Sequence, residues 1–426
     1  MGASTSSGTD PSPHRSRELG QSLRYPAFRN LFASSATSTL GAAISLVSVN
    51  WIVYHFTQSA LDITYVGLTG IAPGIVLGLF AGVIADRYNR RSLMVTADLT
   101  RFAGMGFLTA ALYLTGFSLP LILATMILVN CFSALFTPAS QAILPRLVAK
   151  SSLEDANGLL YSTGGVAYSV GSAAGGIVVV LLGATWGLGI NALTYALSAV
   201  FLVQIAGELG RPGLQGPGTR RSFRSDLSEG LGYVLRNRTL TEVAFGYLPS
   251  NFLSAFTFPY FVVYAATRFG GSALAYAALA AALAAGTAVG GLMVGRFSTR
   301  GIAGWLLGCS LLSEGALDGV LAVSWSLELS VLAALGVGIV IGFANTIYYS
   351  TIQATVPGNL LARVFSIGDF GSFAAIPAGL VVGGLVILRY GIGTAVAIAA
   401  IGIFITGAVL ISLPDFRAFG EKRMLQ

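Results

Sequence analysis

Four charged side chains lie inside long apolar stretches of this sequence, where a charge is costly. Asp98 and Arg101 are three residues apart in one stretch, and Glu314 and Asp318 are four apart in another. A charge at the centre of a membrane-spanning helix costs roughly 2.5–3.5 kcal/mol on insertion scales, so such residues need a partner or a function. Both spacings put the two side chains on one helix face. The first pair can form an ion pair, and the second can share a proton because two adjacent carboxylates do not both ionise cheaply.

Proton transfer is therefore the chemistry that these acids can perform, and Asp369 near the start of a later apolar stretch is a third candidate. Structural roles remain open: the first pair can simply offset its own charge, and the second pair can be hydrogen-bonded or lie near the outer surface. We find no nucleophile–base or metal-ligand arrangement and no Gly-rich phosphate loop. The sequence thus predicts no enzyme, no cofactor, no metal site and no ATP-driven step.

The elements that hold these charges are predicted from composition. Hydrophobic residues make up 54% of the chain, charged residues only 10%, and the mean hydropathy is +0.77. A soluble domain carries about 25% charged residues. Only helices and closed barrels satisfy their own backbone in lipid, and the alternating segments of a barrel are absent. We therefore predict an all-α membrane protein with spanning helices near 28–56, 62–85, 92–115, 119–142, 157–182, 187–206, 240–266, 272–296, 302–323, 329–350, 363–388 and 392–413.

The chain divides near its middle. The segment Gln141–Pro145 returns as Gln353–Pro357, about half a chain length later. Two repeated six-helix bundles with binding near the midplane are typical of transporters. The central linker is rich in Gly and Pro and then carries an amphipathic helix, which either lies on the inner membrane face or only tethers the halves. The predicted parts are a cytoplasmic arm 1–26, an N-terminal bundle 27–206, a linker 207–239, a C-terminal bundle 240–413 and a cytoplasmic tail 414–426.

The charge of +7 is explained by topology. Nearly all of the 24 basic residues fall in the two termini, the central linker and alternate loops. The positive-inside rule then puts both termini in the cytoplasm of a multi-pass cell-membrane protein with an even number of helices. We therefore expect no nucleic-acid partner. Residues 1–26 hold no apolar segment of a cleavable signal peptide, so the first helix is expected to direct insertion.

A charged loop separates the second and third predicted helices. It resembles the loop of the major facilitator superfamily with the pattern G-x-x-x-D-R-x-G-R-R/K. The residues that fit are Gly82, Asp86, Arg87, Arg90 and Arg91, whereas Asn89 replaces the second glycine. Asn tolerates a left-handed backbone at a helix end, so the change is mild. The resemblance implies a latch: Asp86 meets the electropositive start of helix eleven, and the arginines hold the halves in the outward-open state. The alternative is that the cluster only obeys the positive-inside rule.

Further motifs resemble the branch with macrolide-efflux and enterobactin-exporter-like proteins. They are Pro138-Ala139, Leu144-Pro145, Leu153, Ala156-Asn157-Gly158, Asp98 with Arg101, and Asn191-Ala192-Leu193 with Ser198. This resemblance implies export of organic molecules driven by an ion gradient, usually of protons. The segment Gly171–Gly176, with Gly175, also resembles a drug–proton antiporter signature, although Ser172 stands where proline is usual. Helix eleven carries Pro377 among its glycines. Ordinary small-residue packing explains these glycines equally well.

In this superfamily helices one, four, seven and ten line the central path. Each carries one asparagine, and we predict a cavity formed by Asn50, Tyr54, Asn130, Tyr247, Asn251, Phe256, Asn345 and Tyr348. The resemblance puts the ninth helix, with Glu314 and Asp318, outside this path. Apart from Glu242 near the start of the seventh, no acid appears in the four lining helices, which favours an uncharged or amphipathic substrate.

The sequence therefore predicts a monomeric secondary transporter that exports amphipathic organic compounds, of drug, macrolide or siderophore type, in exchange for protons. Two rivals remain. One is an importer or facilitator of a small uncharged nutrient such as a sugar. The other is a membrane scaffold or receptor that transports nothing.

Overall fold

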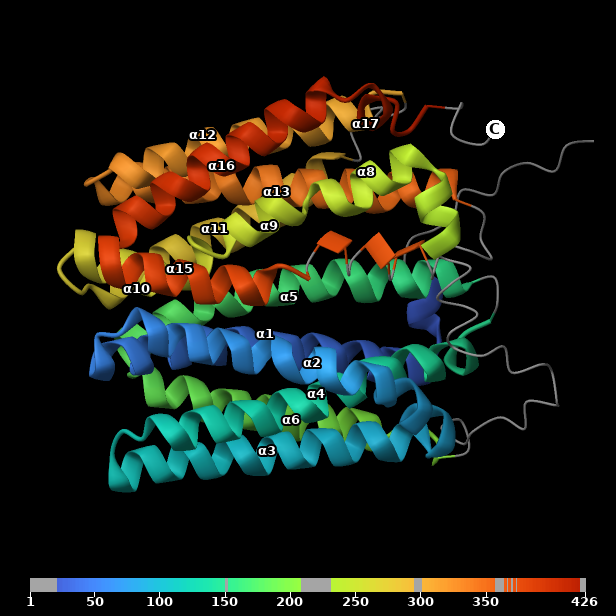
Figure 1. Cartoon of the computed structure of the whole chain (residues 1–426). Coiled ribbons are helices and arrows are strands. Elements are labelled where there is room, and N and C mark those ends of the chain that lie inside the picture. The colour runs from blue at the N-terminus through green and yellow to red at the C-terminus, as the bar shows by residue number, and fades with distance from the viewer. Residues whose placement is uncertain are drawn as a thin grey trace, which may run out of the picture.

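The computed structural model describes residues 21–149, 152–207, 231–294, 301–356, 364–365, 367–368, 371–372 and 374–421. The chain is nearly all-helical, with long helices side by side along one axis (Figure 1). The N-terminal group comprises η1 Gln21–Arg24, α1 Pro26–Thr57, α2 Ala60–Arg87, α3 Arg90–Thr115, α4 Leu119–Leu147, α5 Leu153–Leu181 and α6 Ala184–Val203. The C-terminal group comprises α8 Arg238–Gly246, α9 Leu248–Ser254, η4 Phe258–Tyr260, α10 Phe261–Arg268, α11 Ala273–Met293, α12 Ala303–Val323, α13 Leu327–Thr355, α15 Ile376–Tyr390, α16 Ile392–Ser412 and α17 Pro414–Arg417.

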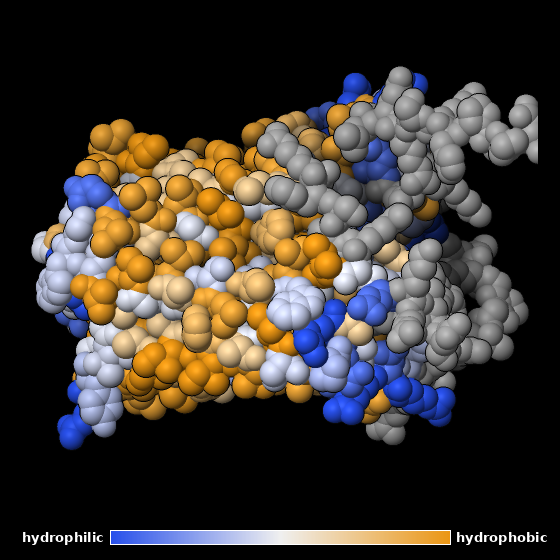
Figure 2. All heavy atoms as spheres, turned by 90° about the horizontal axis from the view of Figure 1, so that it is seen from above, coloured by the Kyte–Doolittle hydropathy of each residue, from blue (hydrophilic) through white to orange (hydrophobic). Residues whose placement is uncertain are grey.

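Nine helices in the described part of the chain are long and apolar enough to cross a membrane. On the face seen in Figure 2, a broad apolar area lies between two more polar ends. Three predicted spans fall outside these nine. α3 is less apolar and contains the buried charges Asp98 and Arg101, α15 is described over only 15 residues, and the predicted span 240–266 is broken into shorter pieces.

Proline explains the broken span. Pro249 lies in the first turn of α9, and Pro259 lies within η4. Each lacks a backbone N–H, and its ring disfavours a helix that continues from the preceding turn. The helix is therefore interrupted at Tyr247 and again between Ser254 and Phe261.

Polar residues fix where several helices begin. Ser59 Oγ accepts a hydrogen bond from the Asp62 backbone N–H at 3.3 Å at the start of α2. Asn89 Oδ1 accepts one from the Ser92 N–H at 3.1 Å at the start of α3. Such N-caps satisfy backbone donors that have no partner inside the helix. Asn89 has a φ of −63°, so it acts as an N-cap and does not use the tolerance of Asn for a left-handed backbone.

Within the N-terminal group, α1 packs against α5 and α6, α3 against α4 and α6, and α2 against α4. Within the C-terminal group, α11 packs against α13, and α12 against α13 and α16. The two groups meet mainly where α5 contacts α11 and α2 contacts α15. Small residues allow the closest approaches: a Cβ on Gly290 of α11 would overlap the Ile339 carbonyl of α13. Close glycine packing is typical of helices in lipid.

Both ends of the described chain lie at one end of the molecule. η1 and α17 are both at the right of Figure 1. We call this the terminal end and the opposite one the distal end. Because α1 and α5 run from the terminal end, their last turns are distal, whereas α2 and α11 begin at the distal end. An even number of crossings is consistent with this placement.

Candidate functional site

A cavity of about 790 Å³ lies between the two groups of helices. It is lined mostly by apolar and aromatic side chains. The N-terminal group contributes residues from α1, α2 and α5, and the C-terminal group contributes residues from α9, α11, α12, α13 and α15. This volume is in the range of pockets that hold drug-sized molecules.

Five of the predicted cavity residues line it: Asn50, Tyr247, Asn251, Asn345 and Tyr348. They come from α1, the α8–α9 junction, α9 and α13. The Asn251 side-chain amide donates a hydrogen bond to the Ser372 carbonyl at 3.0 Å, which ties α9 to the chain just before α15. Tyr247 donates to the Leu307 carbonyl of α12 at 3.2 Å. The asparagines and tyrosines thus give a largely apolar wall a few fixed polar points.

Three predicted residues lie elsewhere. Tyr54 lines a smaller cavity of about 280 Å³ near the distal end, with Trp51 and His55. Asn130 donates its amide to the Met126 carbonyl at 2.9 Å within α4, and no described residue of α4 lines the central cavity. Phe256 is buried, with its ring 5.4 Å from that of Phe252. Side chains of α2, α5 and α11 take the place expected for α4.

Glu314 of α12 lines the cavity, contrary to the expectation that the ninth helix is peripheral. It is the only charged side chain among the described residues of the lining. It is only 7% exposed, and Ser254 of α9 donates a hydrogen bond to its Oε1 at 2.9 Å. The rule that an acid within a spanning helix faces the protein interior was the signal in the sequence that pointed here.

Asp318 lies one turn further along α12, toward the distal end. It is fully buried, and neither carboxyl oxygen has a hydrogen-bond partner among the described residues. Because an α-helix rises 1.5 Å per residue, Asp318 lies about 6 Å further along the axis of α12 than Glu314. An unpartnered carboxylate is very costly in such surroundings, so this group is expected to be neutral.

Asp98 and Arg101 form the predicted ion pair, inside the N-terminal group. Asp98 also accepts a hydrogen bond from the Ser198 hydroxyl of α6 at 2.5 Å. The Arg101 guanidinium lies over the rings of Phe136 and Tyr195, at 4.8 and 4.5 Å from their centroids. Both charged residues are buried, and neither lines the cavity. The pair therefore joins α3 to α4 and α6 rather than facing a ligand.

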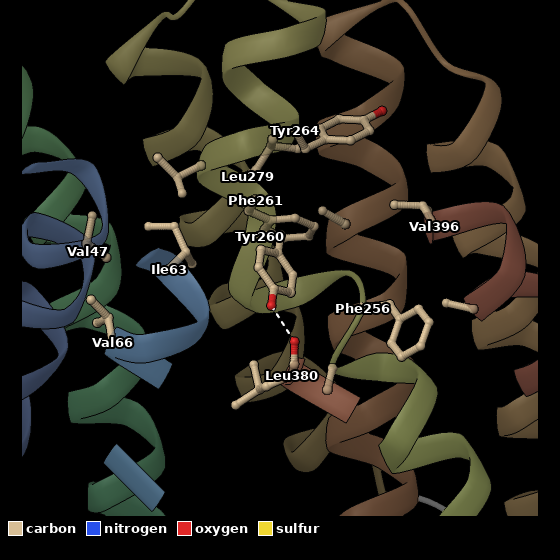
Figure 3. Close-up of a cluster of buried hydrophobic side chains, with 14 of the residues drawn as sticks. Val47, Ile63, Val66, Phe256, Tyr260, Phe261, Tyr264, Leu279, Leu380 and Val396 are labelled. Atoms are coloured by element: carbon tan, nitrogen blue, oxygen red, sulfur yellow. Dashed lines mark hydrogen bonds between the residues drawn. The ribbon is translucent and has the colours of Figure 1, made fainter. Parts of the chain in front are cut away.

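The two groups of helices are held together at the distal end. The hydroxyl of Tyr260 in the C-terminal group lies 2.7 Å from that of Thr64 in α2, and it also donates a hydrogen bond to the Leu380 carbonyl at 2.6 Å (Figure 3). The Trp51 ring of α1 stacks on the Tyr276 ring of α11, with centroids 6.3 Å apart. The residues of α1, α2 and α11 in these contacts lie near the distal ends of their helices, whereas Tyr260 and Leu380 lie nearer the middle of the molecule. These described contacts join the two groups of helices at and near the distal end.

Similarity to a known protein family covers nearly the whole chain. Residues 21–423 match the family described as transmembrane secretion effectors. The chain belongs to this family of the major facilitator superfamily. Relatives include macrolide efflux protein A of Streptococcus pyogenes, 25% identical over 86% of this chain and 90% of that protein. Another is the multidrug efflux pump Tap of Mycobacterium tuberculosis, 28% identical over 94% of this chain and 96% of that protein.

Solved structures show the same fold at low sequence identity. The nucleoside transporter NupG superposes with a TM-score of 0.70 at 14% identity, covering 91% of this chain and 98% of that one. A bacterial homologue of the lysosomal transporter Spinster, inward-facing and unoccupied, gives 0.68 at 18% identity, covering 94% and 98%. This member of the secretion-effector family is therefore a multi-pass membrane transporter. Its family and its named relatives are transporters rather than enzymes.

The loop motif of this family member is described only in part. The side chains of Gly82, Asp86 and Arg87 and the whole of Asp369 lie outside the described residues. Arg90 is buried. Arg91 donates from Nε to the Leu202 carbonyl at 3.2 Å and from Nη2 to the Val203 carbonyl at 2.5 Å. It therefore caps the C-terminal end of α6, where cations are favoured, within its own group of helices.

The glycines of α5 make contacts of two kinds. A Cβ on Gly171 or Gly175 would crowd α1 of the same group, at Leu40 or at Ile44, whereas one on Gly176 would overlap Ala277 of α11 in the other group. This glycine segment thus packs the N-terminal group together and also lets the two groups approach. Pro377 is the second residue of α15 and starts the described helix rather than bending its middle.

Proposed function

We propose that the transporter has twelve spanning helices in two six-helix bundles, 27–206 and 240–413, joined by a cytoplasmic linker 207–239. The arm 1–26 and the tail 414–426 would then lie in the cytoplasm, and the terminal end of the molecule is the cytoplasmic end. Two observations support this topology. The described ends of the chain lie together at the terminal end. Three arginines lie at helix ends on the same side: Arg91 at the start of α3, Arg238 at the start of α8 and Arg417 at the end of α17.

We further propose that this monomeric transporter exports amphipathic organic compounds in exchange for protons. The observation that carries this proposal is the apolar, aromatic cavity of about 790 Å³ between the two groups of helices. Relatives that align over most of their length are named as macrolide and multidrug efflux proteins. Their names favour export over import, and the cavity favours a drug-sized amphiphile over a phosphate ester or dicarboxylate, since no basic residue occurs among its described lining.

Alternating access follows from where the two groups touch. In the structure the described contacts between them gather at the distal end and the middle, which corresponds to a cavity closed to the outside. Opening outward requires these contacts to separate while the cytoplasmic ends approach. We propose that Asp86, with Arg87, Arg90 and Arg91, then latches against the start of helix eleven, near Asp369.

The carboxyl groups of α12 are the better candidates for proton coupling. Glu314 is reached from the cavity and Asp318 lies directly behind it. Asp98 is already bound by Arg101 and Ser198 and is separate from the cavity. A proton that moves down 100 mV releases about 2.3 kcal/mol, which is available to drive export.

The test uses everted membrane vesicles with an internal pH-sensitive dye. After energisation, a panel of macrolides and dyes is added to vesicles with wild-type protein, Glu314→Gln or Asp98→Asn. We expect substrate-dependent proton release from the wild type and its loss in Glu314→Gln. Transport of a compound without proton flux would instead support a facilitator, and accumulation on the cytoplasmic side would support an importer. Absence of any gradient-driven flux would support a scaffold.

A further inference from the structure

Glu314 places one negative group in a cavity where the described lining offers no positive group. We propose that Glu314 binds the positively charged nitrogen of the substrate, so that the preferred substrates are monovalent amphipathic cations. This inference rests on the proposed transport function and names its substrate class. It narrows the sequence-based expectation of an uncharged or amphipathic ligand, which depended on the absence of acids from the middle of helices one, four, seven and ten.

The helices that surround Glu314 supply no countercharge. α9, α13 and α16 contain no Lys, Arg or His, and neither does α12 itself. Ser254 gives the carboxyl a single neutral hydrogen bond. A carboxylate this buried must be neutralised by a proton or by a bound cation. An organic cation in the cavity meets this requirement, whereas an anion would be repelled and a neutral molecule would leave the proton in place.

Aromatic side chains complete the site for a cation. The described lining contains Tyr168, Tyr247, Phe258, Tyr276, Tyr348 and Tyr349. The faces of such rings attract organic cations, and the effect is larger where water is excluded. Tyr247, at the α8–α9 junction, bonds the Leu307 carbonyl of α12, and Tyr348 lies one turn from Asn345 on α13, which packs against α12. The apolar part of a substrate can then rest on the residues of α1, α2 and α11 across the cavity.

Binding of a cation also accounts for exchange with a proton. The titratable groups near Glu314 are Asp318, one turn along α12, and Tyr247 at the α8–α9 junction. Tyr348 of α13 lines the same cavity, and α16 brings no titratable group. Before binding, both carboxyls hold a proton. When the cation binds, Glu314 loses its proton and becomes the counterion, while the buried Asp318 keeps its own. One cation enters the site and one proton leaves, with no net change of charge.

Direct binding to the purified full-length protein in lipid nanodiscs tests this site. The probes are ethidium, a permanent cation, and Nile red, a neutral dye, both followed by fluorescence anisotropy. Glu314→Gln should raise the Kd for ethidium at least tenfold and change that for Nile red less than twofold. Glu314→Asp keeps the charge and should retain part of the ethidium affinity. Asn345→Ala, a neutral change in the same wall, should affect both dyes alike.

The wild-type protein provides a second readout that needs no variant. In weakly buffered solution, ethidium should release about one proton for each molecule bound, and its affinity should rise with pH because the proton competes with the cation. Nile red should do neither. The proposal is overturned if wild-type protein binds no ethidium, if binding releases no proton, or if Glu314→Gln weakens both dyes equally.

The two proposals fail in different ways. If vesicles export a neutral compound in exchange for protons and Glu314→Gln does not alter ethidium binding, the transport function stands and the cation site does not. If ethidium binds through Glu314 but no compound shows gradient-driven flux, the cation site stands and the proposed transport function does not.

Discussion

The hydroxyl oxygens of Thr64 and Tyr260 lie 2.7 Å apart across the boundary between the two groups of helices. Tyr260 also donates to the Leu380 carbonyl at 2.6 Å, and Thr64 donates to the Ala60 carbonyl at 3.2 Å, so either hydroxyl can be the donor in the contact between them. One buried tyrosine thus connects α2, η4 and α15. Because α2 belongs to the N-terminal group and the other two to the C-terminal group, this hydroxyl helps to hold the distal end closed.

Tyr260→Phe should therefore favour opening of the distal end. Only the bond to Thr64 crosses between the two groups, and its loss, about 1 kcal/mol, raises the population of the distal-open state roughly fivefold. Tyr264→Phe is a matched control: it is equally buried, but its hydroxyl bonds the Leu321 carbonyl at 2.8 Å and Ser330 within the C-terminal group.

Double electron–electron resonance between spin labels measures this change. Labels at the exposed positions His55 and Leu274 report the separation of α1 and α11 at the distal end, after replacement of Cys131 and Cys309 by serine. We expect a longer distance to gain population in Tyr260→Phe and not in Tyr264→Phe. Equal distance distributions in wild type and Tyr260→Phe would contradict a closing role for this hydroxyl.

Gly176 and Gly175 are expected to respond differently to alanine. Gly176→Ala puts a methyl group against Ala277 of the other group of helices and should keep the distal end apart, so transport falls strongly. Gly175→Ala puts a methyl group 3.0 Å from the Cα of Ile44 in the same group of helices. This overpacking should lower the free energy of unfolding by about 1–3 kcal/mol. Thermal unfolding together with the distal spin-label distance separates the two effects. The interpretation fails if both variants only lower stability.

The Asp98–Arg101 pair is predicted to stabilise the fold rather than to carry the proton. Arg101→Met leaves a buried carboxylate without its partner and should cost about 3–5 kcal/mol. The double variant Asp98→Asn with Arg101→Met should be more stable than Arg101→Met alone, as measured by unfolding in detergent. Asp98→Asn that folds normally but loses substrate-dependent proton release would show instead that Asp98 is the carrier.

Arg91→Ala should loosen the C-terminal end of α6, since two backbone carbonyls lose their donor. Hydrogen exchange of the last turn of α6 should accelerate severalfold. Arg91→Lys keeps the positive charge but lacks the planar guanidinium, so it should only partly protect the last turn of α6 from hydrogen exchange. Arg417→Ala, on α17 in the other group of helices, serves as the control. Unchanged exchange in Arg91→Ala would mean that these hydrogen bonds do not hold the helix end.

Several helices could be predicted closely from hydrophobic runs and their boundaries. The expected spans 119–142 and 302–323 correspond to α4 Leu119–Leu147 and α12 Ala303–Val323. The span 240–266 was predicted as one helix, and Pro249 and Pro259 break it. The continuous apolar composition of this span predicts one helix. Proline within a helical pattern is, however, a known signal for a break.

The candidate site was predicted less well. Asn50, Asn251 and Asn345 line the cavity as expected, whereas Asn130 bonds within α4 and Tyr54 lies in the smaller distal cavity. The asparagines were predicted to line the cavity because a side-chain amide in lipid needs a hydrogen-bond partner. A backbone carbonyl in the preceding turn satisfies that need as well as a ligand does.

The sequence by itself determined that the chain crosses a membrane as helices, which family it belongs to, and that Asp98 and Arg101 can pair. These properties depend on composition, motif and spacing along one helix. Only the tertiary structure decided that Glu314 faces the cavity and that Gly176 lies against α11. A helix such as α12 is apolar on nearly every side, so its own sequence does not specify its rotation about its axis. The neighbours it packs against determine that rotation, and with it the side chains that a substrate can reach.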